Sequence, residues 1–67
     1  MIAITINGEA REFEVAVNVE QLLTQLDLSG RKIALERNGE IVPRSRFSEQ
    51  TVLDGDRFEI VVAVGGG

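Results

Sequence analysis

The 67-residue sequence contains no cysteine and no histidine. Disulfide bonds and zinc sites built on these residues are therefore excluded as sources of stability. A chain this short buries a smaller share of its surface than a larger domain does, so it needs nearly all its apolar residues in one core. Tryptophan and tyrosine are absent as well. The sequence predicts one small domain, held together by the packing of isoleucine, valine, leucine and phenylalanine.

Long apolar runs and an excess of basic residues are also missing. No stretch approaches the roughly 20 apolar residues that a helix needs to cross a bilayer, and no basic segment precedes an apolar run at the N-terminus. Seven Lys and Arg against eleven Asp and Glu give a net charge of -4, which repels phosphate backbones and anionic lipid headgroups. We therefore expect a cytoplasmic protein that has neither nucleic acid nor a membrane as a partner.

Residues 1–17 alternate as a β-hairpin does. The side of the first strand that we expect to be buried consists of isoleucines, Ile2, Ile4 and Ile6. Asn7-Gly8 follows, a dipeptide that tolerates the positive backbone angles of a tight turn. The buried face predicted for the return strand is formed by Phe13, Val15 and Val17.

A short helix is predicted over residues 19–26. Asn18 can cap its N-terminus, and Gln21 stands three residues later, as in a capping box. The apolar residues that recur at helical spacing are Val19, Leu22, Leu23 and Leu26. Ser29-Gly30 is expected to end this segment.

Another strand is predicted over residues 32–37, with Ile33 and Leu35 directed inward. Asn38-Gly39 then supplies a second turn of the hairpin type. A short strand over residues 40–42 follows this turn.

Pro43 ends the short strand, because proline cannot donate a hydrogen bond to a sheet. Residues 44–50 are predicted to form an irregular, turn-like segment. After a further turn at residues 54–56, residues 57–64 form the last predicted strand. Its inward set is Phe58, Ile60 and Val62.

This order of elements, strand, strand, helix, strand, short strand and strand, predicts an α+β domain. A mixed sheet of about five strands with one helix packed on one face buries the apolar stripes in two layers. That arrangement is the ubiquitin-like β-grasp. We assign residues 1–64 to this domain and residues 65–67 to a flexible C-terminal glycine tail.

The most unusual feature is the end of the sequence, Val64-Gly65-Gly66-Gly67. Glycine has no Cβ, so such a tail takes almost any backbone conformation and can thread a slot too narrow for other residues. A terminal glycine also presents the least hindered α-carboxyl group, which is ionised at neutral pH. Val64, Gly65 and Gly66 are therefore predicted to enter the active sites of partner enzymes, and Gly67 to supply the reacting carboxyl group.

A second explanation of the three glycines is a frayed terminus or a remnant of an expression vector, since chain ends tolerate most sequences. Their position favours the functional interpretation, because they follow directly on a strand of an independently predicted β-grasp domain. Deletion of Gly66 and Gly67 separates the two, since inert glycines would be dispensable.

Over its whole length the chain resembles the ThiS family, the ubiquitin-like sulfur carriers of thiamine biosynthesis. The stretches that carry the resemblance are Ile4-Thr5-Ile6-Asn7-Gly8, Leu22-Leu23, residues 34–44, Asp54-Gly55-Asp56 and Val64-Gly65-Gly66-Gly67. A diglycine end is shared with ubiquitin and with the small subunit of molybdopterin synthase. Residues 34–44 favour ThiS.

The resemblance implies that the chain is a protein cosubstrate and not an enzyme. A ThiF-like adenylyltransferase would use ATP and magnesium to adenylate the carboxyl group of Gly67. Sulfur from a donor such as a cysteine desulfurase system would replace AMP, and the resulting thiocarboxylate would donate sulfur to thiazole synthase. The chain itself would bind no cofactor and no metal, and Gly66 and Gly67 match the family's diglycine.

Three other functions fit parts of the pattern. A molybdopterin-synthase small subunit would deliver the same sulfur to a different acceptor. A ubiquitin-like modifier would join its activated glycine to a lysine, and the conjugates would be visible on a gel. A plain interaction module would use its sheet to bind partners and leave the glycines inert.

The remaining candidate residues have simpler explanations. The two carboxylates of Asp54-Gly55-Asp56 lack the further ligands that calcium requires, so we expect a plain turn. Arg44 and Arg46 are expected to be solvated surface residues, whereas Phe47 is open between the core and an exposed docking role. No histidine is present to activate the nearby hydroxyl groups, Ser45, Ser48 and Thr51. Hydrolase chemistry is therefore not expected.

Overall fold

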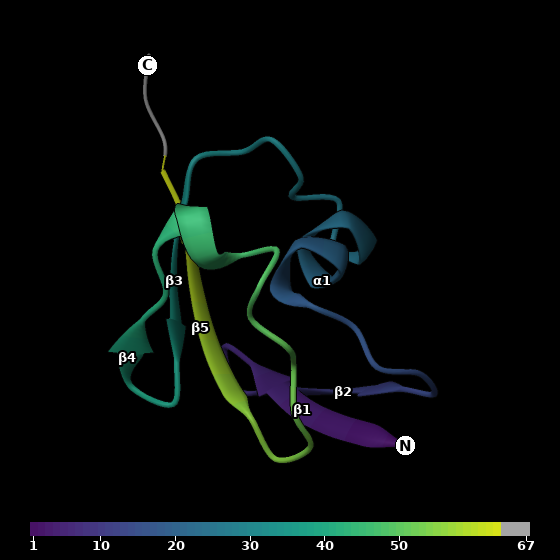
Figure 1. Ribbon diagram of the computed structural model, residues 1–67. Helices are drawn as coiled ribbons and strands as arrows, with labels where there is room; N and C mark the ends of the chain where they lie inside the picture. The colour runs from purple at the N-terminus through teal and green to yellow at the C-terminus, as the bar shows by residue number, and fades with distance from the viewer. Residues whose placement is uncertain (64–67) are drawn as a thin grey trace.

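A computed structural model describes residues 1–63 of the chain (Figure 1). The elements in this part follow the predicted order. They are β1 (Ile2–Ile6), β2 (Glu9–Phe13), α1 (Val19–Gln25), β3 (Ile33–Arg37), β4 (Glu40–Ile41), the 3-10 helix η1 (Arg44–Arg46) and β5 (Arg57–Val62). Neither helix in this range is long and apolar enough to cross a lipid bilayer.

The strands form one five-stranded sheet in the order β2-β1-β5-β3-β4. β1 and β5 run parallel, while β1 with β2, β3 with β5 and β3 with β4 are antiparallel. The predicted mixed sheet is therefore confirmed. The last strand in the sequence, β5, lies at the centre of the sheet, between the first strand and the third.

Both predicted Asn-Gly turns are confirmed. Asn7 and Gly8 have φ angles of 49° and 84°, and Asn38 and Gly39 have 52° and 87°. Positive φ at both central residues is the geometry that matches the twist of a two-residue hairpin. Asparagine and glycine adopt it at low cost, which explains why the chain reverses at these two positions.

The predicted capping box of α1 is also present. Asn18 Oδ1 accepts a hydrogen bond from Gln21 N at 2.7 Å, and Gln21 Oε1 accepts one from Asn18 N at 2.9 Å. The helix ends earlier than the Ser29-Gly30 signal suggested. Asp27 already has a φ of 61°, and Leu28 N donates to Leu23 O at 2.8 Å. This residue in the left-handed region closes the last turn, so Ser29-Gly30 belongs to the following loop.

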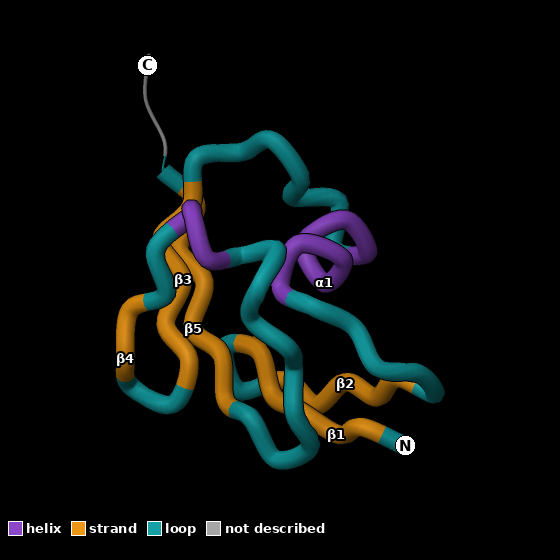
Figure 2. Tube along the Cα trace, in the orientation of Figure 1, coloured by secondary structure: helices purple, strands orange, loops and turns teal. Residues whose placement is uncertain are grey.

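The core lies between α1 and one face of the sheet (Figure 2). The segment after η1 reaches the start of α1, where Phe47 O accepts from Glu20 N at 3.2 Å and Gln50 O accepts from Val19 N at 2.9 Å. The sequence left open whether Phe47 is a core residue or an exposed docking residue. Phe47 is only 7% exposed and therefore belongs to the core. The buried apolar set is Ile4, Ile6, Val17, Val19, Leu22, Leu23, Leu35, Val42, Phe47, Val52, Phe58 and Ile60.

The predicted burial of Val15 is wrong. Val15 was expected beside Phe13 and Val17 on a buried strand face, but its side chain is 70% exposed. β2 ends at Phe13, so the two-residue alternation no longer applies to the residues that follow. Val17 is buried because the loop turns back towards α1, and Val52 N donates to its carbonyl oxygen at 2.9 Å.

Candidate functional site

The predicted site residues Val64, Gly65, Gly66 and Gly67 lie outside the described residues. The structure does describe the strand that leads to them. β5 pairs with β3 as far as Val62, and Ala63 N donates to Lys32 O at 2.8 Å. The predicted sulfur-attachment residue is therefore four positions beyond a backbone that is hydrogen-bonded to the sheet.

β5 is held on both sides. Phe58 and Ile60 are 1% and 7% exposed and point into the core. On the side of β1, the Asn7 side chain pairs with the backbone of Ile60. Asn7 Nδ2 donates to Ile60 O at 3.1 Å, and Asn7 Oδ1 accepts from Ile60 N at 2.8 Å. The Asn7 side chain thus continues the parallel pairing of β1 with β5 beyond the end of β1. These hydrogen bonds fix the backbone of β5 at Ile60.

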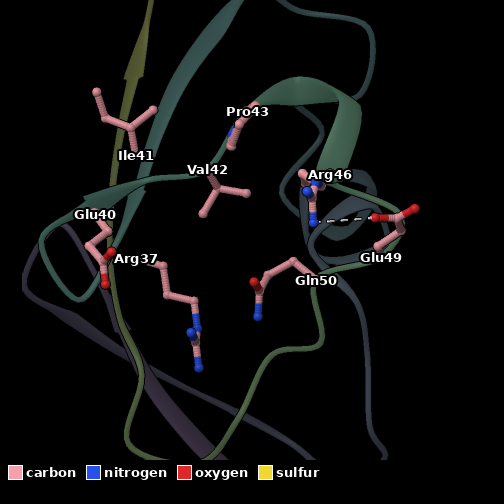
Figure 3. A pocket seen from close by; sticks show the side chains of 8 residues that line it. All are labelled: Arg37, Glu40, Ile41, Val42, Pro43, Arg46, Glu49 and Gln50. Atoms are coloured by element: carbon pink, nitrogen blue, oxygen red, sulfur yellow. Dashed lines mark ion pairs between the residues drawn. The ribbon is translucent and has the colours of Figure 1, made fainter.

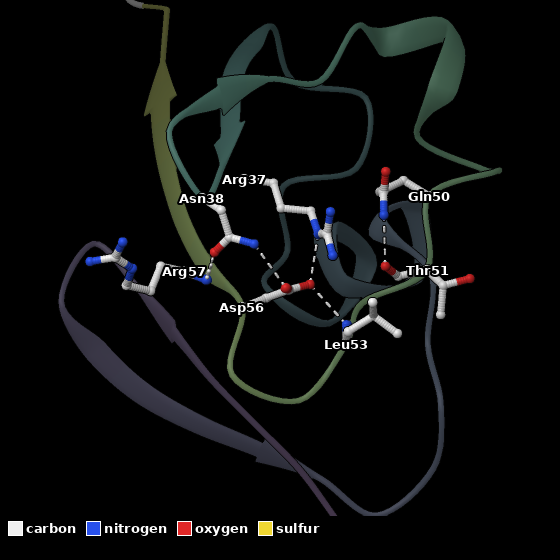
Figure 4. Close-up of polar contacts among 7 residues, drawn as sticks. All are labelled: Arg37, Asn38, Gln50, Thr51, Leu53, Asp56 and Arg57. Atoms are coloured by element: carbon white, nitrogen blue, oxygen red, sulfur yellow. Dashed lines mark hydrogen bonds and ion pairs between the residues drawn. The ribbon is translucent and has the colours of Figure 1, made fainter.

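A second polar cluster fixes the start of β5 (Figure 4). The carboxylate of Asp56, which is 5% exposed, accepts three hydrogen bonds. Its Oδ2 accepts from Arg37 Nε and from Leu53 N, both at 2.8 Å, and its Oδ1 accepts from Asn38 Nδ2 at 3.1 Å. Arg57 N in turn donates to Asn38 Oδ1 at 2.9 Å. These contacts join the β3–β4 turn to the residues just before β5.

The charge of Asp56 is stabilised within this cluster. Burial on its own raises the pKa of the carboxyl group, but the hydrogen bonds from Arg37, Leu53 N and Asn38, together with the Arg37 charge, outweigh it. The pKa of Asp56 consequently lies below its usual value. Asp54 has a similar local role, because its Oδ1 accepts from Ala3 N at 2.7 Å. The turn assigned to residues 54–56 is confirmed, and both carboxylates bind the protein's own donors.

A groove of about 350 Å³ lies between β4 and η1 (Figure 3). Its walls carry both signs of charge, from Arg37 and Arg46 on one hand and from Glu40 and Glu49 on the other. Arg46 Nη1 lies 3.8 Å from Glu49 Oε2, and both side chains are about two-thirds exposed or more, at 70% and 68%. Arg46 is thus the solvated residue that the sequence predicted. The mixed charges of the groove select no ligand of one sign.

Within residues 1–63, no group of three or more carboxylate side chains is placed to hold a metal ion. The sequence analysis did not identify the partners of Asp56. Arg37 and Asn38 lie 19 and 18 residues before it, and only the pairing of β3 with β5 brings them together. The one signal for this cluster in the sequence was the acidic residue Asp56 directly before the buried strand β5.

The fold and the position of the glycines define the class of protein. One helix on a mixed five-stranded sheet, with β1 and β5 parallel at its centre, is a ubiquitin-like β-grasp, and the sequence continues from its central strand into three glycines. The chain belongs to the ThiS family, whose family model matches residues 4–67.

Individual relatives agree with this assignment. The chain is 34% identical over 64 residues to the sulfur carrier protein ThiS of Escherichia coli, covering 96% of this chain and 97% of that protein. A crystal structure of the thiamine biosynthesis protein ThiS from Geobacter metallireducens has a TM-score of 0.82 and 33% sequence identity. That comparison covers 98% of this chain and 100% of the other. The predicted β-grasp fold is confirmed.

One relative is much longer. A thiazole synthase of Paramagnetospirillum magneticum is 50% identical over 64 residues, which make up 96% of this chain and 20% of that protein. The present chain therefore spans about a fifth of the length of that relative. In this thiazole synthase, a segment similar to the whole β-grasp domain is part of the same polypeptide.

Proposed function

We propose that this chain, as a member of the ThiS family, carries sulfur for thiamine biosynthesis on the carboxyl group of Gly67. One observation supports this site above all others. The match to the family model extends to residue 67, so the matched range includes the three glycines. The carrier acts as a protein cosubstrate, and partner enzymes perform each chemical step.

The chemistry of a carboxylate sets the order of these steps. A carboxylate is a poor electrophile, because its negative charge repels a nucleophile and oxide is a poor leaving group. A ThiF-like adenylyltransferase converts the carboxylate of Gly67 to an acyl-adenylate with ATP and magnesium, which that enzyme binds. The terminal sulfur of a persulfide, supplied by a cysteine desulfurase system, then attacks the acyl carbon and expels AMP. A second thiol cleaves the S–S bond of the resulting acyl disulfide, so that the two thiols form a disulfide and the electron pair of the broken bond stays on the carrier's sulfur. The product is a thiocarboxylate at Gly67.

The sulfur acceptor that we propose is a thiazole synthase. Support comes from two relatives of this chain, the thiazole synthases from Paramagnetospirillum magneticum and Magnetococcus marinus. In each of them, the segment similar to this chain makes up 20% of the protein. Fusion of a carrier to its acceptor keeps the two at a high effective concentration. The separate carrier would deliver its thiocarboxylate to the corresponding separate enzyme.

The body of the carrier and its end have different tasks in this proposal. Residues 1–63 present the end of β5, and Val64, Gly65 and Gly66 pass through the narrow entrance of each partner. A side chain on any of these glycines would need space that glycine does not. Such a change should block loading without affecting the core, which lies within residues 4–60.

The decisive experiment measures loading directly. The chain is incubated with ATP, magnesium, a sulfur donor and a ThiF-like enzyme, and its intact mass is recorded. We expect the increase that corresponds to one oxygen replaced by sulfur, located at Gly67 by fragmentation. Two control variants, Gly66→Leu and a chain that lacks Gly67, should show no increase while keeping the wild-type thermal midpoint. Unchanged loading of either control, or conjugates to lysine in place of the thiocarboxylate, would overturn the proposal.

A further inference from the structure

Strand β2 forms one edge of the sheet, and its outer side has backbone groups that can pair with a further strand. In the part of the chain that the structure describes, β2 pairs with β1 alone. Thr5 N and Ala3 O of β1 form hydrogen bonds of 3.1 and 2.7 Å to residues just before β5, on the other side of β1. Their partners on β2 are Ala10 and Glu12, which in an antiparallel pair must direct their own backbone groups away from β1.

The two edges of the sheet differ in how well they are protected. The other edge is β4, which consists of Glu40–Ile41 and is followed by Pro43. A very short strand and a proline are common means of preventing the addition of another strand. β2 has five residues and contains neither proline nor lysine. Within residues 1–63, no other segment forms a backbone hydrogen bond with the outer side of β2.

Two opposite charges on β2 lie on the same face of the sheet. Glu9 and Arg11 are two positions apart and pair with Ile6 and Ile4 on the side of the core. Both are exposed, because α1 does not extend over this edge. Neither forms an ion pair with another group among the described residues. The edge therefore presents one charge of each sign, with Ala10 between them.

This order of charges fits a second β2 strand in one register. Two copies related by a two-fold axis perpendicular to the sheet pair antiparallel and keep the same face of each sheet on the same side. With Ala10 on the axis, Glu9 of each copy lies opposite Arg11 of the other. With Arg11 on the axis, two arginines would lie opposite each other, and with Glu12 on it, two glutamates would do so. Like charges in that position destabilise a sheet, whereas opposite charges stabilise it.

We propose that β2 is a self-association edge, at which a second copy of this chain adds its own β2 in the register centred on Ala10. The backbone groups of the two Ala10 residues pair with each other. Glu9 and Arg11 form the closer pairs on either side, with Cα atoms about 4.5 Å apart. The two five-stranded sheets become one sheet of ten strands, with both α1 helices on the same face.

The dimer is independent of the function proposed above and compatible with it. β5 is separated from the β2 edge by β1, so the end of β5 stays accessible in both copies. The contact is confined to one strand of five residues from each copy, which is smaller than a standard interface. The association is therefore weak and reversible, and it responds to salt because two of its contacts are ion pairs between exposed residues.

Sedimentation equilibrium of the chain alone tests the proposal. At low salt and concentrations from about 10 μM to about 1 mM, the wild-type chain should show a dimer. Arg11→Glu and Glu9→Arg should each weaken it about tenfold or more, since each places two like charges opposite each other twice. The two substitutions change the net charge in opposite directions, so repulsion between whole molecules does not explain a loss in both. The double variant Glu9→Arg/Arg11→Glu restores both pairs and should dimerise within about threefold of the wild-type chain.

Two further variants separate charge from backbone pairing. Arg31→Glu is the matched control for Arg11→Glu, because Arg31 is exposed in the loop between α1 and β3, at the far end of the molecule from β2 (Figure 1). Its dimer affinity should stay within about twofold. Ala10→Pro removes the outward N–H of the central residue and keeps every charge. An edge strand tolerates such a proline, so this variant should remain folded by circular dichroism and be monomeric.

Each outcome gives a decision. Loss of the dimer in both single variants, with recovery in the double variant, supports the proposal. A wild-type chain that is monomeric at about 1 mM would overturn it, and so would a double variant that stays monomeric. Equal losses for Arg31→Glu and Arg11→Glu would reduce the effect to net charge and overturn it. A monomeric wild-type chain whose Ala10→Pro variant binds thiazole synthase less well would assign the edge to a strand of that enzyme instead. Sulfur loading is not part of this readout, so its failure would affect the proposed function alone.

Discussion

Consecutive residues of β5 belong to two different surfaces. Phe58 and Ile60 face α1 and are almost fully buried, whereas Glu59 and Val61 face away from it and are exposed. The inner face contains the packing that stabilises the domain. The outer face contains the directly opposed carboxylates of Glu36 and Glu59 and exposed apolar atoms, which contribute nothing to that packing. A single strand thus has a packed face and an exposed face, because its side chains alternate.

Truncation of the inner face gives the largest expected effect. Phe58→Ala removes a ring that is 1% exposed and should destabilise the domain by about 3–5 kcal/mol. A domain of this size has little more stability than that in total, so we expect a largely unfolded chain. Denaturant titration followed by circular dichroism measures the change. Val61→Ala on the outer face is the control and should alter the free energy of unfolding by less than about 0.5 kcal/mol. Similar losses for the two variants would contradict the division between the faces.

Substitution of Asp56 tests whether a buried polar group contributes as much to the free energy of unfolding as the apolar inner face does. In Asp56→Asn, the amide nitrogen would face either the Arg37 and Leu53 donors or the Asn38 donor. At least one of these donors is therefore left without its acceptor, and we expect a loss of about 1–3 kcal/mol. Chemical denaturation at neutral pH measures it. A wild-type midpoint would show that the cluster adds no stability.

The same carboxyl group predicts a dependence on pH. Because the folded pKa of Asp56 is lowered, ionisation stabilises the folded state at every pH above the unfolded value of about 3.9. This contribution is lost as the pH falls below that value and through the folded pKa. Asp56→Asn should therefore show a weaker decrease of stability between neutral and acidic pH than the wild-type chain. Parallel acid-denaturation curves would contradict the assignment.

The features that sequence analysis predicted correctly are local. The Asn7-Gly8 and Asn38-Gly39 turns depend on the backbone preferences of two adjacent residues, and the capping box depends on residues three apart. Alternation identified the inward residues of β1, β3 and β5. Val15 was misplaced because alternation holds only while a strand continues, and nothing in the residues around Phe13 marks its end.

Contacts between distant segments could not be predicted in the same way. The Arg37–Asp56 ion pair and the Asn7–Ile60 pairing depend on which strands become neighbours. The opposition of Glu36 and Glu59 further depends on register, since a shift by one residue would move each side chain to the other face. For the candidate site, the prediction about Gly67 rests on the sequence, because residues 64–67 lie outside the described residues.

A smaller effect is expected at the start of α1, which covers the inner face. Asn18→Ala removes the acceptor for Gln21 N, and the free energy of unfolding should fall by about 1 kcal/mol. Asn18→Ser keeps a capping oxygen and serves as the control. A wild-type midpoint for Asn18→Ala would contradict the stabilising role of the cap.

The smallest predicted change in stability has the opposite sign. Glu59→Gln removes one of two like charges on adjacent strands, so the free energy of unfolding should rise by about 0.2–0.5 kcal/mol at low salt. Added salt should remove this gain, because it screens the repulsion in the wild-type chain. The control is Glu12→Gln, which should leave the free energy of unfolding unchanged, because Glu12 pairs with Ala3 and not with another carboxylate. Loss of stability in Glu59→Gln would show that this carboxylate makes a favourable contact in the sheet.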